Sequence, residues 1–239
     1  MPTVNVNIQP AILNWALDQT NEEKLGKKLA ENIKHWLDGS KCPTFNQIEE
    51  FSKKTHIPIG YFFLQTPPKE QVNLLEYRTV DSLDLANPSR DLLDTIHEME
   101  IVQEWMADYK KELYYDKVTF IGSLNEITDI NVIVNKIRMD LGLDLEWYKE
   151  CESCSKAFNK VRGLLEECGV LVMINGIVGK NTHRALNLNE FRAFAMVNEW
   201  APLIFINGAD SAGGRLFSLF HELTHLWIGK DDLYNDRKY

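Results

Sequence analysis

The stretch FSLFHELTHLWIGK, residues 217–230, decides how the rest of this 239-residue chain is interpreted. It contains the pattern His-Glu-x-x-His as His221, Glu222 and His225. Residues four apart share one face of a helix, so both imidazoles can reach a single ion. Glu222 points to the neighbouring strip of the helix, which suits a general base that acts on water beside the ion. The pattern therefore predicts a metal centre with Zn²⁺ as its cofactor.

The residues around the pattern favour a helix. Gly229 offers a stop just after the last apolar residue. A wide apolar face is formed by Leu216, Phe217, Phe220, Leu223, Leu226 and Trp227. The five-residue pattern also occurs by chance in unrelated proteins. An ordinary helix that holds two histidines without a metal is therefore the alternative.

A short sheet is expected just before this helix. The hydrophobic period changes after Gly169, and residues 170–174, 191–197 and 203–206 are predicted to be strands. The turn Asn207-Gly208-Ala209-Asp210 follows, and the helix should begin near Asp210 or Ser211. Many zinc peptidases place a short sheet before their His-Glu-x-x-His helix. An edge strand of such a sheet can hold an extended peptide by backbone hydrogen bonds.

The segment NGIVGKNTHRALN, residues 175–187, carries a third histidine, His183, beside Arg184. These two side chains are candidates for substrate binding, since they could polarise a carbonyl group or bind a carboxylate. A histidine in a loop has many other uses, so a purely structural role stays open.

Composition narrows the class of protein. The net charge of −9 and the pI near 5.2 argue against nucleic-acid binding by the chain as a whole, although a small DNA-reading module remains compatible. We find no apolar run as long as a membrane span and no signal-peptide pattern in MPTVNVNIQP. A cytoplasmic protein with four reduced thiols is expected. Cys151 and Cys154 form a CxxC that no further cysteine pair completes as a zinc set.

The N-terminal third has the pattern of short helices joined by tight turns, which suggests a helix-turn-helix fold. The predicted helices cover residues 11–17, 21–29, 30–37 and 44–54, followed by a short apolar element at 58–64. Lys27, Lys28 and Lys34 are the candidate phosphate contacts for DNA binding. A helical docking or dimerisation module is the alternative interpretation.

The middle of the chain is predicted to be helical as well. A Pro-rich connector, QTPPKEQ at 65–71, separates it from the N-terminal third. A long helix is expected over residues 89–115 with Ser89 as its N-cap. Two further helices are expected, one capped by Asp129 and running to residue 141, the other over 145–168 and ended by Gly169.

Several of these stretches together resemble the ImmA/IrrE family of metallo-endopeptidases, in the subgroup with an N-terminal Xre-like helix-turn-helix domain. The resemblance rests on LNWALDQT, WLDGSKCPTFNQIEEFSKKTHIPIGYFFLQTPP, YRTVDS and PSRDLL, and on the long stretch from Gly169 to Gly229. It implies an α+β, mostly helical fold. The implied domains are an Xre-like helical module at 1–66, a connector at 67–88 and a zincin-like metallopeptidase domain at 89–239.

The resemblance also implies a function. His221 and His225 would bind zinc, and Glu222 would be the general base of a regulatory endopeptidase. Its protein substrate would be a repressor or an antitoxin-like protein, as in relatives associated with mobile elements and toxin–antitoxin pairs. The alternatives are a non-catalytic transcriptional regulator or antitoxin, and a truncated remnant that serves as an interaction domain.

The family usually draws its third metal ligand from an acidic residue on a later helix. Downstream of His225 this sequence contains only three carboxylates, Asp231, Asp232 and Asp236. We expect the peptidase domain to be incomplete at its C-terminus, with its third ligand unassigned.

Overall fold

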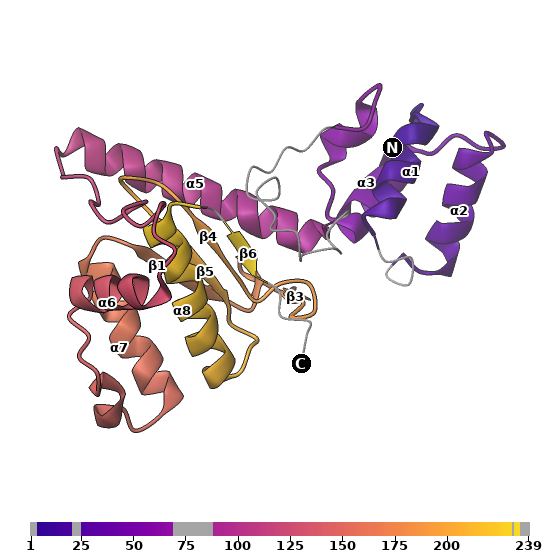
Figure 1. The fold of residues 1–239 in the computed structure, drawn as a ribbon. Coiled ribbons are helices and arrows are strands. Elements are labelled where there is room, and N and C mark those ends of the chain that lie inside the picture. Colours follow the sequence, from indigo (N-terminus) through magenta and orange to yellow (C-terminus); the bar gives the residue numbers. More distant parts are fainter. Residues whose placement is uncertain (1–3, 21–24, 69–87, 231, 235–239) are drawn as a thin grey trace. The chain divides into compact units, whose positions relative to one another are not determined.

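The computed structural model describes residues 4–20, 25–68, 88–230 and 232–234 (Figure 1). The predicted class, α+β and mostly helical, is confirmed. The chain divides into two compact units: the first contains the described residues up to 68 together with 88–93, and the second contains those from Asp94 onward. The predicted connector at 67–88 lies almost entirely outside the described residues, so the proposed domain boundaries remain a prediction.

The first unit is a small helical domain. It contains α1 (Pro10–Asp18), α2 (Lys27–Leu37), α3 (Phe45–Thr55) and the short 3₁₀ helix η2 (Ile59–Phe63). Its core is formed by apolar residues from every one of these elements, including Ile12, Leu13, Leu29, Ile33, Trp36, Ile48, Phe51 and Phe62. Thr44 and Gln47 form a reciprocal capping box, which fixes the predicted start of α3.

The prediction of separate helices at 21–29 and 30–37 is wrong. A single helix, α2, runs from Lys27 to Leu37, and the amide of Ala30 donates to the carbonyl of Gly26 at 3.1 Å. No proline or glycine interrupts the chain between these ends, so the i→i−4 hydrogen bonds continue. Gly26, with φ of 75°, precedes the first helical residue. Residues 21–24 lie outside the described part.

Four helical elements precede the sheet of the second unit: α5 (Arg90–Glu112), α6 (Ile130–Asp140), η3 (Trp147–Glu150) and α7 (Cys154–Glu167). Ser89 and Asp129 cap α5 and α6 as predicted. The prediction of one continuous helix over 145–168 is wrong. The helical structure is interrupted after Glu150, and α7 starts anew because Ser153 takes the N-cap position and accepts from the amide of Lys156 at 3.3 Å.

The three predicted strands are confirmed as β1 (Leu171–Asn175), β4 (Ala193–Met196) and β5 (Leu203–Asn207). They lie in a sheet of order β1-β5-β4-β6, in which only the β1–β5 pairing is parallel. The last strand, β6 (Asp232–Tyr234), was not predicted. The hairpin of β2 (Ile177–Val178) and β3 (Asn181–Ala185) was not predicted either, since the polar sequence NTHRA lacks the alternation that marks a strand.

The two faces of this sheet carry side chains of different size. On one face, Ala193, Ala195, Ile204 and Ile206 pack against the apolar side of α8 (Ala212–Ile228), with α7 beside it. The two alanines let the helix approach β4 closely. On the other face, Phe191, Phe194 and Phe205 form a ring cluster with centroids 5.0 to 6.2 Å apart.

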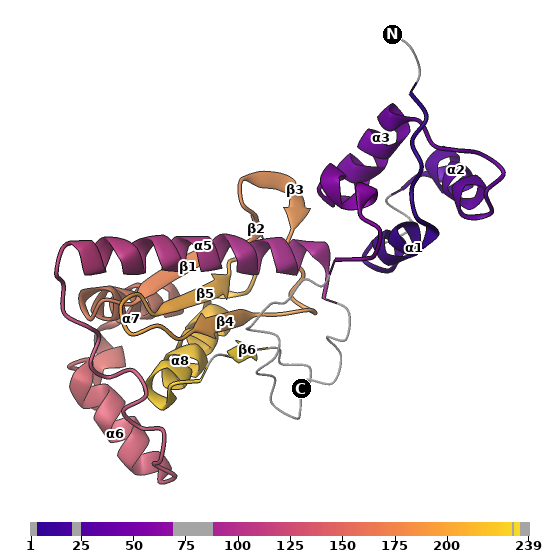
Figure 2. The same ribbon diagram turned by 90° about the horizontal axis from the view of Figure 1, so that it is seen from above.

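Figure 2 shows α5 and α8 on opposite sides of the sheet. Helix α5 therefore lies on the side of the three phenylalanines, because Ala193 and Ala195 face α8. The amide of Gln103 donates to the carbonyl of Met196 at 2.8 Å, and the ammonium of Lys110 donates to the carbonyls of Gly169 and Trp200. Burial lowers the pKa of Lys110. These polar contacts fix α5 along the sheet at two points.

The C-terminal carbonyls of α8 are capped by a segment distant in sequence. The amides of Gly122 and Leu124 donate to the carbonyls of Leu226 and Trp227 at 3.0 and 2.9 Å. Such end carbonyls lack partners within the helix itself. The indole of Trp227 stacks on Phe120 with a centroid distance of 3.9 Å.

The same indole donates to a carboxylate oxygen of Asp140 at 2.9 Å, which links α8 to α6. Burial alone would raise the pKa of Asp140. The hydrogen bonds from Lys136 and Trp227 outweigh this effect, so the pKa is lowered.

We predict that Gly229→Ala destabilises the fold. Gly229 has φ of 78°, and an added Cβ would lie 2.8 Å from the Cα of Gly122. Left-handed strain and overpacking together should cost at least about 2 kcal/mol. Gly213→Ala is the matched control on the same helix, because nothing lies within 4 Å of its Cβ position. Urea denaturation should give a lower midpoint for Gly229→Ala alone. Equal midpoints for the two variants would contradict this account.

Candidate metal centre

Helix α8 places the three residues of the His-Glu-x-x-His pattern. The helix starts after Ser211, whose hydroxyl accepts from the amide of Gly214 at 3.0 Å. It ends at Gly229 in the left-handed conformation. Both ends agree with the prediction. The helical spacing brings His221 and His225 together on one face, each of them half-buried.

The two imidazoles approach each other closely. Their Nε2 atoms are 3.2 Å apart, and the ring centroids are 4.9 Å apart. Two nitrogens that each lie about 2.05 Å from a tetrahedral zinc ion are about 3.3 Å apart. The spacing of the histidines therefore fits a shared zinc ion.

Glu222 differs from the histidines in its burial. Its side chain is 0% exposed, whereas the two imidazoles remain partly accessible. An ionised carboxylate in the interior is costly unless other charges or hydrogen bonds compensate it. A divalent cation at the adjacent histidine pair would lower that cost. The arrangement supplies two nitrogen donors and one carboxylate that could exchange a proton with water.

Among the residues that the structure describes, no group of three His, Cys, Asp or Glu side chains is placed to hold a metal ion. Asp231 and Asp236 lie outside the described residues. Asp232 belongs to β6, whose backbone pairs with β4 through Ala195. The described part of the centre is therefore the histidine pair, and the third ligand stays unassigned.

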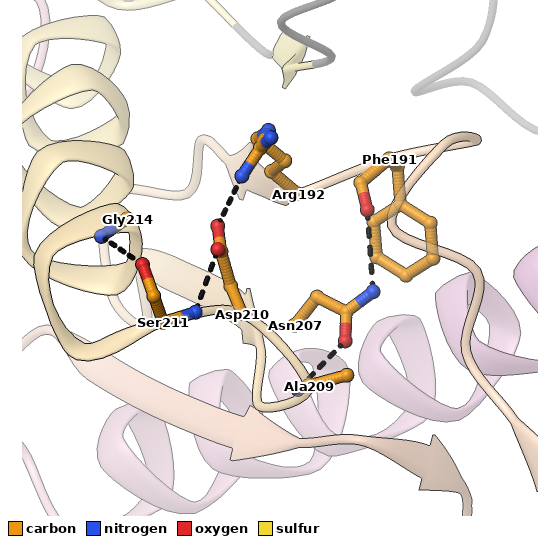
Figure 3. Close-up of polar contacts among 7 residues, drawn as sticks. All are labelled: Phe191, Arg192, Asn207, Ala209, Asp210, Ser211 and Gly214. Atoms are coloured by element: carbon orange, nitrogen blue, oxygen red, sulfur yellow. Dashed lines mark hydrogen bonds and ion pairs between the residues drawn. The ribbon is translucent and has the colours of Figure 1, made fainter.

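A polar network anchors the beginning of α8 to the sheet (Figure 3). Asp210 accepts from the guanidinium of Arg192 at 2.6 Å and from the amide of Ser211 at 2.7 Å. Asn207 bridges the carbonyl of Phe191 and the amide of Ala209. These contacts join the entrance of α8 to the segment before β4 and to the end of β5.

Gly214 completes this anchor, because a Cβ there would lie 2.4 Å from a carboxylate oxygen of Asp210. Sequence reasoning expected a turn at 207–210 but missed the roles of Arg192 and Asp210. Their positions 18 residues apart give no local signal of an ion pair.

His183 and Arg184 lie on β3. The hairpin lies on the α5 side of the sheet, and α8 lies on the opposite side (Figure 2). Arg184 forms an ion pair with Asp94 of α5 at 2.7 Å, and its side chain is only 11% exposed. His183 is exposed. Substrate binding by either residue stays a prediction.

The candidate DNA contacts lie in the first unit. Lys27, Lys28 and Lys34 are exposed on α2, while Leu29 and Ile33 of the same helix enter the core. DNA binding by these lysines also stays a prediction.

The four cysteines are free thiols, as expected from the sequence. Burial raises the pKa of the Cys168 thiol, with further contributions from Asp140 and Glu167. A thiol with a raised pKa carries less of the nucleophilic thiolate at neutral pH. Its environment therefore gives Cys168 no sign of a catalytic role.

Comparison with known proteins gives one match. Residues 165–238 match the peptidase family M78 model, described as an IrrE N-terminal-like domain. No curated protein and no solved structure matches the chain. Within the described residues, no helix is both long and apolar enough to cross a membrane. The matched segment contains every strand from β1 to β6 of the described residues and the whole of α8. The match supports the ImmA/IrrE family of metallopeptidases as the family that this segment resembles.

Proposed function

We propose that the chain is a zinc-dependent endopeptidase of the regulatory type. The observation that carries this proposal is the pair of imidazole nitrogens 3.2 Å apart, on the same helix as the fully buried Glu222. The family match covers this helix and the sheet that precedes it. Both lines of support concern residues 165–238 and are independent of the N-terminal unit.

The residues divide the catalytic work. His221 and His225 would hold the zinc ion, which would supply Lewis acidity at the scissile carbonyl group. Glu222 takes a proton from the attacking water and passes it to the leaving amine. The rigid placement of this glutamate on a capped helix favours proton transfer in a fixed direction.

The proposed substrate is a repressor or an antitoxin-like protein. This part of the proposal rests on the family resemblance and on the presence of a separate helical unit before the peptidase domain. An extended segment of such a substrate could be held by backbone hydrogen bonds at a sheet edge.

Glu222→Gln should abolish cleavage and leave metal binding intact. The amide has nearly the same shape as the carboxylate but cannot accept the proton from water. The assay is cleavage of any repressor-like protein encoded beside the gene, followed by electrophoresis, with the metal content of each variant measured in parallel. Cleavage at the wild-type rate by the Gln variant would contradict the assigned role.

His221→Ala should lower the zinc content well below the value of about one ion per chain expected for a single site. The removed imidazole is one of two described donors, so affinity should fall sharply. His97→Ala is the matched control, since His97 lies on α5 and contacts Glu100 at 3.0 Å. Elemental analysis after dialysis against limiting zinc gives the measurement. Wild-type protein that retains no zinc would overturn the metal centre itself.

We also propose a second candidate function, DNA binding by the first unit. The exposed lysines 27, 28 and 34 on α2, opposite its buried side, favour it. This activity requires no metal. It would fit a non-catalytic regulator or antitoxin as well as a peptidase. A chain that serves only as an interaction domain would show neither repressor cleavage nor DNA binding.

Replacing Lys27, Lys28 and Lys34 by Gln should weaken binding to the upstream DNA of the gene. Each lost phosphate contact should reduce the slope of log affinity against log salt by about one. Lys53 and Lys54, exposed on α3, give a control double variant of the same chemistry. Fluorescence anisotropy over a salt series gives the slopes. Equal slopes for wild-type and triple variant would exclude these lysines as contacts.

A further inference from the structure

The outward face of α5 carries two parallel rows of side chains. One row is apolar and contains residues at four-residue spacing: Ile101, Trp105 and Tyr109, continued by Leu113 directly after the end of the helix. The adjacent row is acidic at the same spacing: Glu100, Glu104, Asp108 and Glu112. Residues four apart form a ridge along one face of a helix, so the rows run side by side.

The apolar row is not part of the core. Ile101 and Trp105 are 66% and 62% exposed, and Tyr109 and Leu113 are also exposed. The opposite side of the helix provides the buried residues Met99, Gln103 and Ala107. Helix α5 therefore has one side that packs on the sheet and a second, exposed apolar side, which we call the α5 stripe.

The aromatic side chains of the α5 stripe stack on each other. The rings of Trp105 and Tyr109 stack at 5.6 Å with an angle of 13° between their planes. Tyr114 and Tyr115, both exposed, extend the apolar surface beyond the end of the helix. Large contiguous apolar patches on soluble proteins mark interaction sites, and Trp and Tyr are among the residues enriched at binding hot spots.

The acidic row determines the kind of partner. Lys111 contacts Asp108 and His97 contacts Glu100, but no ion pair is found for Glu104 or Glu112 among the described residues. Desolvation of this row against an apolar or acidic partner would be costly, whereas Lys or Arg on the partner would offset that cost. The surface therefore favours a partner with apolar side chains flanked by basic ones.

A second copy of the chain in an antiparallel arrangement fits this surface poorly. An antiparallel two-fold pair packed through the stripe would bring both acidic rows to the same side of the interface. Like charges in that position repel each other. The stripe from Ile101 to Leu113 spans about 18 Å of helix, which matches a partner helix of three to four turns, roughly 12 to 15 residues.

We propose that the α5 stripe is a docking site for a basic amphipathic helix of a partner protein. The apolar face of that helix packs along Ile101, Trp105, Tyr109 and Leu113, and its Lys or Arg side chains pair with the acidic row. This site is separate from the histidine pair on α8, and it requires neither metal nor proteolysis.

Two synthetic amphipathic peptides of about 14 residues test the proposal. Both carry leucine on one helical face, and the rest of the sequence is lysine in one peptide and glutamate in the other. Anisotropy titrations with the full chain should show salt-dependent binding of the Leu/Lys peptide and no binding of the Leu/Glu peptide. Trp105→Gln should weaken Leu/Lys binding at least about tenfold, and the double variant Glu104→Gln with Glu112→Gln should reduce its salt dependence.

Matched controls separate the stripe from the overall negative charge. Met139→Gln removes an exposed apolar side chain on α6, and Glu126→Gln removes an exposed acidic one; both should leave binding unchanged. Equal binding of the two peptides, loss of binding in the controls, or failure of the Leu/Lys peptide to bind would overturn the proposal. So would a wild-type dimer, seen by sedimentation, that Trp105→Gln dissociates.

Discussion

The rotation of α8 about its own axis is the constraint on which the candidate centre depends. Leu219, Leu223 and Leu226 are buried in the core cluster that includes Ala193 and Ala195. A helix with a wide apolar face has one low-energy rotation against such a surface, because any other exposes leucine and buries polar groups. This rotation leaves the two histidines on the partly accessible side and Glu222 inside. The geometry of the centre is thus a consequence of core packing.

The two ends of α8 are fixed by different physics. At the N-terminus, the negative charge of Asp210 lies where the helix dipole favours it and is held by Arg192. At the C-terminus, the backbone amides of Gly122 and Leu124 satisfy carbonyls that would otherwise need water. The N-terminal anchor depends on an ion pair and the C-terminal anchor on close packing of the backbone. A side chain would disturb the first at Gly214 and the second at Gly229.

Much of this arrangement could be predicted from the sequence. Periodicity located α8, α5 and the three strands β1, β4 and β5. The capping residues Ser89, Asp129 and Ser211 marked helix starts, because their hydroxyl or carboxylate groups accept hydrogen bonds from backbone amides. The polar hairpin and the three-residue β6 were missed, since their strands depend on pairing with distant partners. The break before α7 was missed because the helical pattern on both sides concealed Ser153 as a cap. The ion pairs of Arg192 and Arg184 could not be predicted from local patterns, because their partners lie far away in the sequence.

Strand β4 has a position that links these observations. The chain enters α8 from β5 and leaves it toward β6, and both strands pair with β4 from opposite sides. The histidine-bearing helix therefore connects two strands that both pair with the same short strand, the four-residue β4. Partial unwinding of α8 at either end pulls on a pairing with β4, so local opening of the helix is coupled to opening of the sheet. The helix and the sheet therefore behave as a single cooperative unit. The distance between the two imidazoles is maintained by strand pairings that do not involve the histidines themselves.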